Sequence, residues 1–313
     1  MNQSKHEWWS ITHAISFEDA HRASEMRAAV AWHKGQLRGT AARQPFDAIM
    51  ENVAAPANVR YEPDRVGGIA GWWCRVNGSP EGEVILYLHG GWFNWGSAQA
   101  YRNFAGQIAS RSGVDTFIPD YRLAPEHPFP AGLDDVLACY GGLIQRGLRK
   151  IAVAGDSAGG CLCLVMLALV ATGSAFDGVI PLAGVAMSPV TDLALQGDSW
   201  TTRAIADPLF TKPQAGELVR AYFGDADPAD PRVSPLYGNV AGLPPLRIQV
   251  GEDEVLFDDS KRYVDRVVQG GGDARLDVWE GMPHVFQAEV GKFTASAQAL
   301  DEVSAFLSDR LTS

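Results

Sequence analysis

The sequence has few cysteines and no long apolar run. Its 313 residues include four cysteines, which are Cys74, Cys139, Cys161 and Cys163. Four cysteines in a chain of this length do not make a disulfide framework, so we expect buried free thiols. The longest apolar run, residues 161–171, falls short of the ~20 residues that a membrane span needs. Residues 1–16 also lack the apolar stretch of a signal peptide, which predicts a cytoplasmic protein.

Positive charge is in short supply as well. The chain has 26 lysines and arginines against 37 aspartates and glutamates, for a formal net charge of −11. It therefore lacks the basic footprint of a nucleic-acid-binding protein. No GxGxxG or Walker A pattern occurs, and His127 and the scattered acidic residues lack metal-ligand spacing. We expect no nucleotide cofactor and no metal ion.

What the chain does contain is a large apolar fraction, 46% of its residues, arranged in short runs that alternate with helical patterns. The expected strands are residues 69–76, 84–88, 116–118, 151–154, 184–187, 246–250 and 276–279. The expected helices are residues 18–34, 101–111, 131–146, 158–171, 258–269 and 294–311. Continuously apolar strands alternating with helices predict an α/β fold with a mainly parallel central sheet flanked by helices.

Two blocks do not follow this alternation. One is residues 1–50, which we expect to form an N-terminal cap segment. The other is residues 193–242, rich in Asp and Pro, which we expect to be a helical cap inserted into a single domain over residues 51–313. We also expect a strand before residue 69, joined to the strand 69–76 by a turn at residues 63–65.

The pentad Gly155–Gly159 matches G-x-S-x-G and carries Ser157 at its centre. It follows a predicted strand and opens an apolar helix, the context of a nucleophile elbow. Glycines on either side give room to a serine held in a strained backbone conformation. The helix N-terminus then presents the Ala158 amide to a developing oxyanion.

Other strand ends supply partners for a nucleophilic serine. His89, Gly90 and Gly91 end the strand 84–88, where glycines let backbone N–H groups approach a substrate carbonyl. His284 follows the strand 276–279. The acidic residues 252–254 follow the strand 246–250, and ligands of parallel sheets bind at such carboxyl ends. The chain order serine, acid, histidine is that of α/β-hydrolases.

This ordered set resembles the bacterial hormone-sensitive-lipase-like esterases of the α/β-hydrolase superfamily. The matching stretches are residues 89–91, 120–126, 155–160, 188–192, 243–245, 254–259 and 284–286. The resemblance implies an α/β-hydrolase fold in which Ser157 is the nucleophile and His284 the general base. It also implies an oxyanion hole made by the backbone amides of Gly90, Gly91, Trp92 and Ala158.

The sequence departs from the family pattern at two positions. Trp92 stands where the family commonly has a third glycine, which a backbone oxyanion hole tolerates if the dihedral angles allow. The usual acid is the first Asp of an Asp-Pro-Leu-x-Asp motif, and aligning Leu256 and Asp258 places Glu254 there. A glutamate can orient the imidazole equally well, so we favour Glu254, with Asp253 as the alternative acid.

The resemblance implies a serine carboxylesterase acting on small to medium acyl esters through an acyl-enzyme. An amide hydrolase with the same triad is the alternative, since the nucleophile machinery is shared. A non-catalytic binding protein of this fold is disfavoured because His284 is retained. Neither alternative nor the main prediction requires a cofactor.

Several further residues are candidates for contact with the substrate or with structural partners. Aromatic side chains suit a pocket wall. Asp156 adjoins the nucleophile and could contact substrate, although we favour a role in hydrogen bonding to the backbone of the elbow. The candidate substrate-binding residues are Trp92, Phe93, Asp156, Trp200 and Phe210. We expect Tyr121, Arg122, Glu126 and Asp134 to brace the glycine loop. If the strand 276–279 is an open edge, it could pair two subunits as a homodimer.

Overall fold

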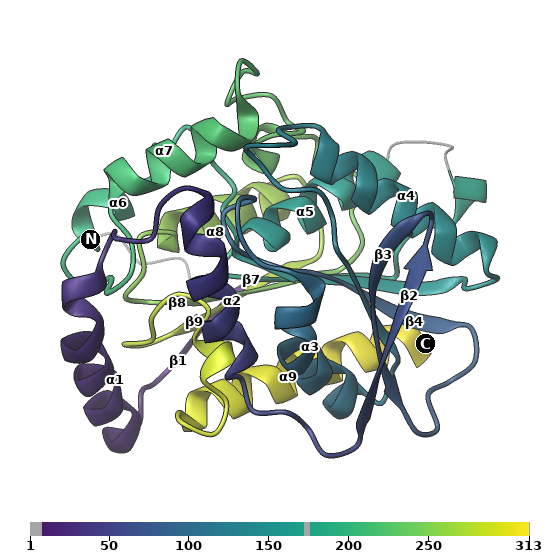
Figure 1. Cartoon of the computed structure of the whole chain (residues 1–313), viewed down its shortest axis with the longest axis horizontal. Coiled ribbons are helices and arrows are strands. Elements are labelled where there is room, and N and C mark those ends of the chain that lie inside the picture. The colour runs from purple at the N-terminus through teal and green to yellow at the C-terminus, as the bar shows by residue number, and fades with distance from the viewer. Residues whose placement is uncertain (1–7, 172–175, 313) are drawn as a thin grey trace.

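The structure, a computed structural model, describes residues 8–171 and 176–312. A nine-stranded sheet runs through this part of the chain in the order β1-β9-β8-β7-β6-β4-β5-β3-β2 (Figure 1). Its strands are β1 (Ser10–His13), β2 (Val59–Val66), β3 (Ile69–Val76), β4 (Glu83–Leu88), β5 (Thr116–Pro119), β6 (Lys150–Asp156), β7 (Ala183–Met187), β8 (Leu246–Gly251) and β9 (Ala274–Trp279). Only the pairs β2–β3 and β3–β5 are antiparallel.

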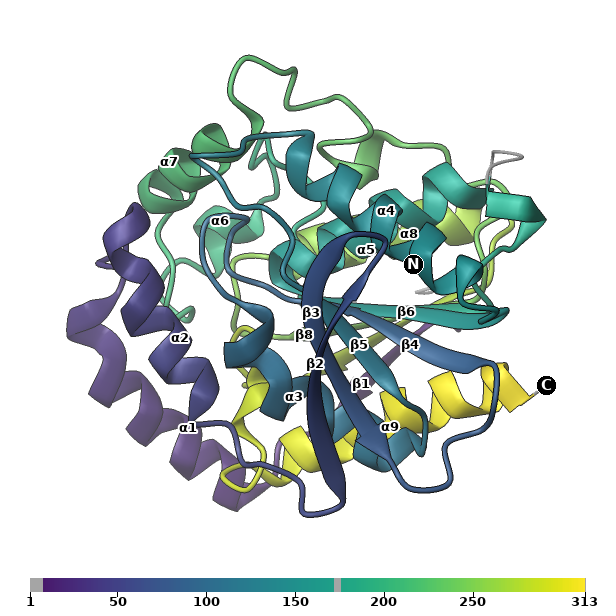
Figure 2. The ribbon, with the colours of Figure 1, turned by 45° about the vertical axis from the view of Figure 1, so that its right-hand side comes forward.

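Helices cover both faces of the sheet. The α-helices are α1 (Phe17–Val30), α2 (Arg43–Glu51), α3 (Ala98–Ser112), α4 (Ala131–Gln145), α5 (Ser157–Ala171), α6 (Ser199–Thr202), α7 (Lys212–Phe223), α8 (Phe257–Gln269) and α9 (Thr294–Thr312). Short 3-10 helices span Ala31–His33, Thr40–Ala42, Phe176–Gly178, Pro235–Tyr237 and Phe286–Glu289. Helices α4, α5 and α8 lie on one face, and α3 and α9 on the other (Figures 1 and 2). The predicted α/β class with a mainly parallel sheet is confirmed.

The central strands β4, β5 and β6 are mainly apolar because both faces of the sheet are covered there. Every residue of β4 and β5 is buried, and all of β6 except Lys150 is buried as well. Such strands cannot alternate between core and solvent, so each reads as an unbroken apolar run. This is why their positions were predictable from local sequence.

The first hairpin turns at a different place from the one expected. Residues 63–65 lie inside β2, and the turn is made by Gly67 and Gly68, whose φ angles are +59° and +83°. Two successive positive φ angles favour glycine in a tight hairpin turn. Pro63 is tolerated within a strand because β2 is at the edge of the sheet.

The N-terminal segment contributes a strand as well as a covering. Strand β1 pairs in parallel with β9, with Ser10 opposite Leu276 and His13 opposite Trp279. The edge of β9 is therefore occupied, and the expectation that residues 276–279 form an open edge for a homodimer is wrong. Residues 1–7 of the expected cap segment lie outside the described residues. Helices α1 and α2 stand beside one end of the sheet, at the left of both views (Figures 1 and 2).

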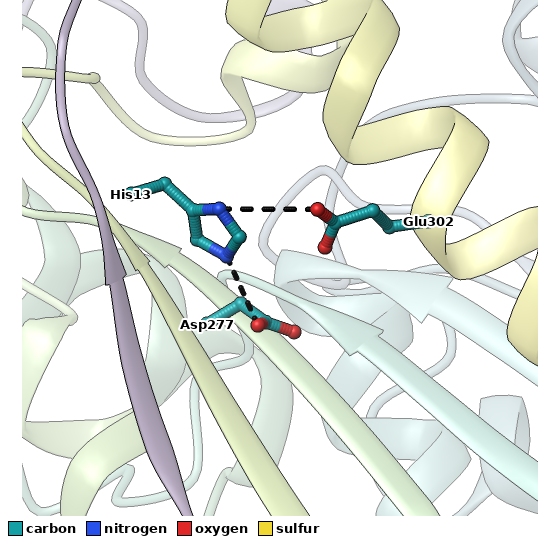
Figure 3. A group of neighbouring side chains, drawn as sticks. All are labelled: His13, Asp277 and Glu302. Atoms are coloured by element: carbon teal, nitrogen blue, oxygen red, sulfur yellow. Dashed lines mark hydrogen bonds and ion pairs between the residues drawn. The ribbon is translucent and has the colours of Figure 1, made fainter.

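Three ionisable side chains connect β1 to β9 and to α9 (Figure 3). His13 Nε2 lies 3.1 Å from Asp277 Oδ1, and His13 Nδ1 lies 3.8 Å from Glu302 Oε1. The three side chains could in principle hold a metal ion. However, Arg247 and Arg275 also contact the fully buried Asp277 carboxylate, at 2.5 and 3.0 Å. Two guanidinium groups at the same carboxylate favour an ion-pair network over a cation site.

The sequence predicts buried free thiols and no membrane-spanning segment. All four cysteines are free and buried. Within residues 8–171 and 176–312, no helix is long and apolar enough to cross a membrane.

Candidate active site

Ser157 sits at a sharp junction between strand and helix. Strand β6 ends at Asp156 and α5 begins at Ser157, whose φ of +52° lies in the left-handed region. A Cβ at Gly159 would lie 2.0 Å from the Leu88 carbonyl oxygen, and one at Gly155 would lie 2.5 Å from the Gly159 carbonyl oxygen. Both glycines are therefore required sterically, as the motif predicts for a strained turn.

His284 and Glu254 form a short, buried contact. His284 Nδ1 lies 2.6 Å from Glu254 Oε2, and the Glu254 side chain is fully buried. The other oxygen, Oε1, accepts hydrogen bonds from Ser188 Oγ at 2.8 Å and from the Gly251 amide at 2.7 Å. The alternative acid, Asp253, is instead paired with Arg27. The structure thus brings Glu254, and not Asp253, to the histidine.

The environment of His284 favours its protonated form. Burial by itself lowers the pKa of the imidazole, but the charge and hydrogen bond of Glu254, together with nearby carboxylates, outweigh it, and the pKa ends above the usual 6.5. Asp207 and Asp156 contribute smaller effects in the same direction. A base that must accept a proton during a reaction gains from such partners, because they stabilise the imidazolium.

The glycine loop after β4 differs in one respect from the expected oxyanion hole. The Gly90 amide donates to Asp156 Oδ1 at 3.0 Å, so it is already engaged with the protein. Contrary to expectation, the Gly90 amide is therefore not free to contribute to an oxyanion hole. Gly91 has a φ of +110°, and a Cβ there would lie 2.3 Å from the Trp95 carbonyl oxygen. Trp92 adopts a φ of +54°, which lets it stand where the family pattern has glycine.

Asp156 serves the protein's own backbone and tyrosines. Besides the Gly90 amide, its carboxylate accepts hydrogen bonds from Tyr87 Oη at 2.7 Å and from Tyr101 Oη at 3.2 Å. Burial raises the pKa of Asp156 to about 6, although these hydrogen bonds oppose the rise. Asp156 borders the cavity described next, but its oxygens already have three partners. The contacts favour a structural role in the elbow over substrate binding.

Ser157 and His284 open into a cavity of about 540 Å³. Its walls are mostly apolar and come from the N-terminal segment, the glycine loop, the inserted block and the loop after β9. The lining side chains include Met26, Val30, Leu37, Phe46, Ile49, Met50, Trp92, Trp95, Leu209, Phe210, Val285 and Phe286. The Phe210 ring stands edge-on to His284, with centroids 5.0 Å apart, and edge-on to Trp92 at 5.2 Å.

Two of the expected substrate-binding aromatics lie elsewhere. In the described part of the chain, Trp92 and Phe210 line the cavity, whereas Phe93 and Trp200 do not. Phe93 is buried and stacks on Tyr222 with centroids 3.8 Å apart. Trp200 is buried beside Trp92, at a centroid distance of 6.5 Å. Both side chains pack in the core, so their assignment to the substrate site is wrong.

The brace around the glycine loop forms with one change of partner. Tyr121 Oη donates to the His89 carbonyl at 2.6 Å, and Glu126 pairs with Arg43 of α2. Arg122 pairs with Asp135 at 2.7 Å, whereas the expected Asp134 is exposed. Asp135 lies one position further along α4, on the buried side of the helix.

Asp207 is a site residue that the sequence did not single out. It is fully buried in the inserted block, and its Oδ1 accepts hydrogen bonds from the Leu209 and Phe210 amides at 2.7 and 2.9 Å. Its Oδ2 accepts from the Val255 amide at 2.9 Å, next to Glu254. Asp207 therefore joins the cavity wall to the loop that carries the acid. A lone Asp-Pro in a loop gave no sequence signal for this contact.

Comparison with known proteins agrees with the fold. Residues 85–288 match the family model described as the alpha/beta hydrolase fold. An acetyl-hydrolase of Streptomyces hygroscopicus is 34% identical over 245 residues, covering 77% of this chain and 80% of that protein. An esterase of Acinetobacter venetianus is 32% identical and covers 86% of this chain and 89% of that protein.

Solved structures also agree with the fold. The crystal structure of an esterase from the bacterial hormone-sensitive lipase family superposes with a TM-score of 0.86 at 34% identity. The match covers 96% of this chain and all of that one. The chain therefore belongs to the α/β-hydrolase family, among the hormone-sensitive-lipase-like esterases, and is a carboxylic ester hydrolase.

Proposed function

We propose that the ester hydrolysis proceeds through a triad of Ser157, His284 and Glu254. The observation that carries the proposal is the 2.6 Å contact between His284 Nδ1 and Glu254 Oε2, with Ser157 and His284 bordering the same cavity. A carboxylate at Nδ1 fixes the tautomer whose Nε2 is free to accept a proton. The strained Ser157 supports the nucleophile assignment.

In the proposed reaction, His284 Nε2 takes the Ser157 hydroxyl proton as Oγ attacks the ester carbonyl carbon. The carbonyl oxygen becomes an oxyanion, which the amides of Gly91, Trp92 and Ala158 stabilise. As the tetrahedral intermediate collapses, the C–O bond to the alcohol breaks and His284 donates its proton to the leaving oxygen. Water then repeats the sequence on the acyl-enzyme, releasing the acid and restoring Ser157.

The cavity supports small to medium acyl esters as substrates. Its volume of about 540 Å³ and its apolar wall suit an alkyl chain next to the scissile carbonyl. Phe210 and Trp92 narrow the space beside the nucleophile. Two of the relatives are named an esterase and an acetyl-hydrolase, and both names are consistent with acyl groups of this size.

The test uses p-nitrophenyl esters of increasing acyl length beside a matched p-nitroanilide. We expect turnover of the short and medium esters and little of the anilide. Ser157→Ala should lower ester hydrolysis by several orders of magnitude and abolish covalent labelling by an organophosphate. Wild-type turnover in this variant would refute the triad. Faster cleavage of the anilide than of its ester would identify an amide hydrolase instead.

A further inference from the structure

One side chain of the N-terminal segment contacts both loops that carry the proposed acid and base. Arg27 lies on α1, far in sequence from either loop. Its Nη2 donates to the Gly281 carbonyl at 2.7 Å and also forms an ion pair with the Asp253 carboxylate. Gly281 precedes His284 by three positions, and Asp253 directly precedes Glu254. A single nitrogen therefore connects the acid loop to the base loop.

Next to Arg27, the two loops also meet through their backbones, apart from the His284–Glu254 contact itself. The Asp253 amide donates to the Met282 carbonyl at 3.1 Å. A Cβ at Gly251 would lie 2.2 Å from the same Met282 oxygen, so the loops touch without an intervening side chain. Arg27 adds a side-chain connection to this seam. Ile15, from the same segment, reaches to within 2.7 Å of a Cβ position at Gly281.

We propose that Arg27 is a positioning residue for the reaction, holding the acid and base loops at the spacing that the His284–Glu254 contact requires. The inference rests on the triad proposed above. By pairing with Asp253, Arg27 also keeps a second carboxylate away from the imidazole, and Glu254 remains its bonded partner.

We expect the loss of the Arg27 contacts to displace the side chains of the proposed triad more than it destabilises the fold. The side chains of Arg27 and Asp253 are 32% and 20% exposed, so solvent weakens their attraction. The guanidinium has a fixed planar geometry, however, and offers two hydrogens from one nitrogen to two different loops. Small displacements of catalytic groups cost rate much more than they cost stability.

The experiment compares wild type, Arg27→Met and a control, Arg22→Met. Arg22 lies on the same helix and bonds Glu18 and the Lys292 carbonyl, away from both loops. We would measure kcat and KM for p-nitrophenyl butyrate and the rate of Ser157 phosphonylation by an organophosphate. Arg27→Met should lower kcat and the phosphonylation rate about tenfold, with KM within twofold. Arg22→Met should match wild type, and Arg27→Lys should be intermediate.

The proposal is overturned if folded Arg27→Met reacts at the wild-type rate, or if only its KM or melting temperature changes. Should Arg27→Met not fold, Asp253→Asn replaces it, because this variant keeps the Arg27–Gly281 bond. About a threefold loss of kcat would then support the proposal, and an unchanged kcat would overturn it. Ser157→Ala run in parallel separates the two ideas, since its full activity would refute the triad whatever Arg27 does.

Discussion

The Glu254 carboxylate meets His284 with one oxygen and is held in place by the other. Its Oε2 lies 2.6 Å from His284 Nδ1, while Oε1 accepts from Ser188 and from the Gly251 amide. The Val285 amide in turn donates to Ser188 Oγ at 3.1 Å, which ties the histidine loop into the same group. These contacts hold the imidazole in one orientation, as the proposed proton transfer requires.

The first prediction concerns the choice of acid. Glu254→Gln keeps the size of the side chain but removes the charge that orients the imidazole and stabilises its protonated form. We expect kcat to fall by about 10³- to 10⁴-fold. The matched change Asp253→Asn should cost only about threefold. Steady-state kinetics on p-nitrophenyl butyrate would measure both, and equal losses would contradict the assignment.

The second prediction concerns pH. His284 must be neutral to accept a proton, so kcat/KM should fall as pH drops through its pKa, which lies above 6.5. Glu254→Gln removes the main cause of the rise, so the residual activity should show an acid limb at lower pH. Because the pKa of His284 is raised in the folded chain, this group stabilises the fold fully below its unfolded pKa, and that contribution is lost as pH rises through the folded pKa. Acid inactivation through His284 should therefore precede unfolding, which far-ultraviolet circular dichroism at each pH would check.

The third prediction concerns the size of the substrate. Phe210→Ala removes a half-buried ring beside His284 and Trp92 and widens the cavity at the nucleophile. We expect the ratio of kcat/KM for octanoate and acetate esters to rise by about fivefold to tenfold. Phe93→Leu is the control, because Phe93 packs on Tyr222 away from the cavity. If both variants changed the ratio equally, Phe210 would not be a selective wall residue.

The fourth prediction concerns the attachment of β1. His13 stacks on Trp279 with centroids 4.0 Å apart and bonds Asp277. His13→Ala should lower the free energy of unfolding by about 1–2 kcal/mol, the usual range for one hydrogen bond and one ring contact. Urea denaturation would measure the change. Asp277 keeps both arginine partners in the variant, so a loss much above this range would mean that β1 detaches entirely.

The same group of side chains gives a prediction about metal ions. Because Arg247 and Arg275 contact Asp277, we expect no divalent cation to bind between His13, Asp277 and Glu302. Incubation with EDTA should leave ester hydrolysis and the melting temperature unchanged. A melting temperature that rises on addition of Zn²⁺ to wild type, and not to His13→Ala, would show that a cation site exists.

Local sequence signals were sufficient for the central strands and for the helices that flank them. The strands around Ser157 are unbroken apolar runs, and the glycines at 155 and 159 are imposed by contacts within a few ångströms of the turn. Glu254 is favoured over Asp253 through the family resemblance, because aligning Leu256 and Asp258 with the family motif places Glu254 at the position of the acid. The apolar runs and the glycine spacing can be read in short stretches of sequence, although the contact that excludes a Cβ at Gly159 comes from Leu88 on another strand.

Features that depend on distant residues were not predictable in the same way. Strand β1 has only four residues, three of them polar, and forms because β9 offers it an edge. Phe93 and Trp200 look like pocket aromatics, but neighbours far along the chain decide that they face the core. The Gly90 amide points to Asp156, 66 positions away, and Arg27 reaches loops more than 200 positions distant. No short pattern encodes such pairings.

The pairing of β1 with β9 has a consequence for how the enzyme is made. Strand β1 is synthesised long before its sheet neighbour, Ala274–Trp279. Contacts of such sequence separation form late in folding, because the closing loop is long. Until then the wall of the cavity is incomplete, and Arg27 does not yet connect the two loops. We therefore expect ester hydrolysis to begin only after β9 and the following loop, which carries His284, have been synthesised.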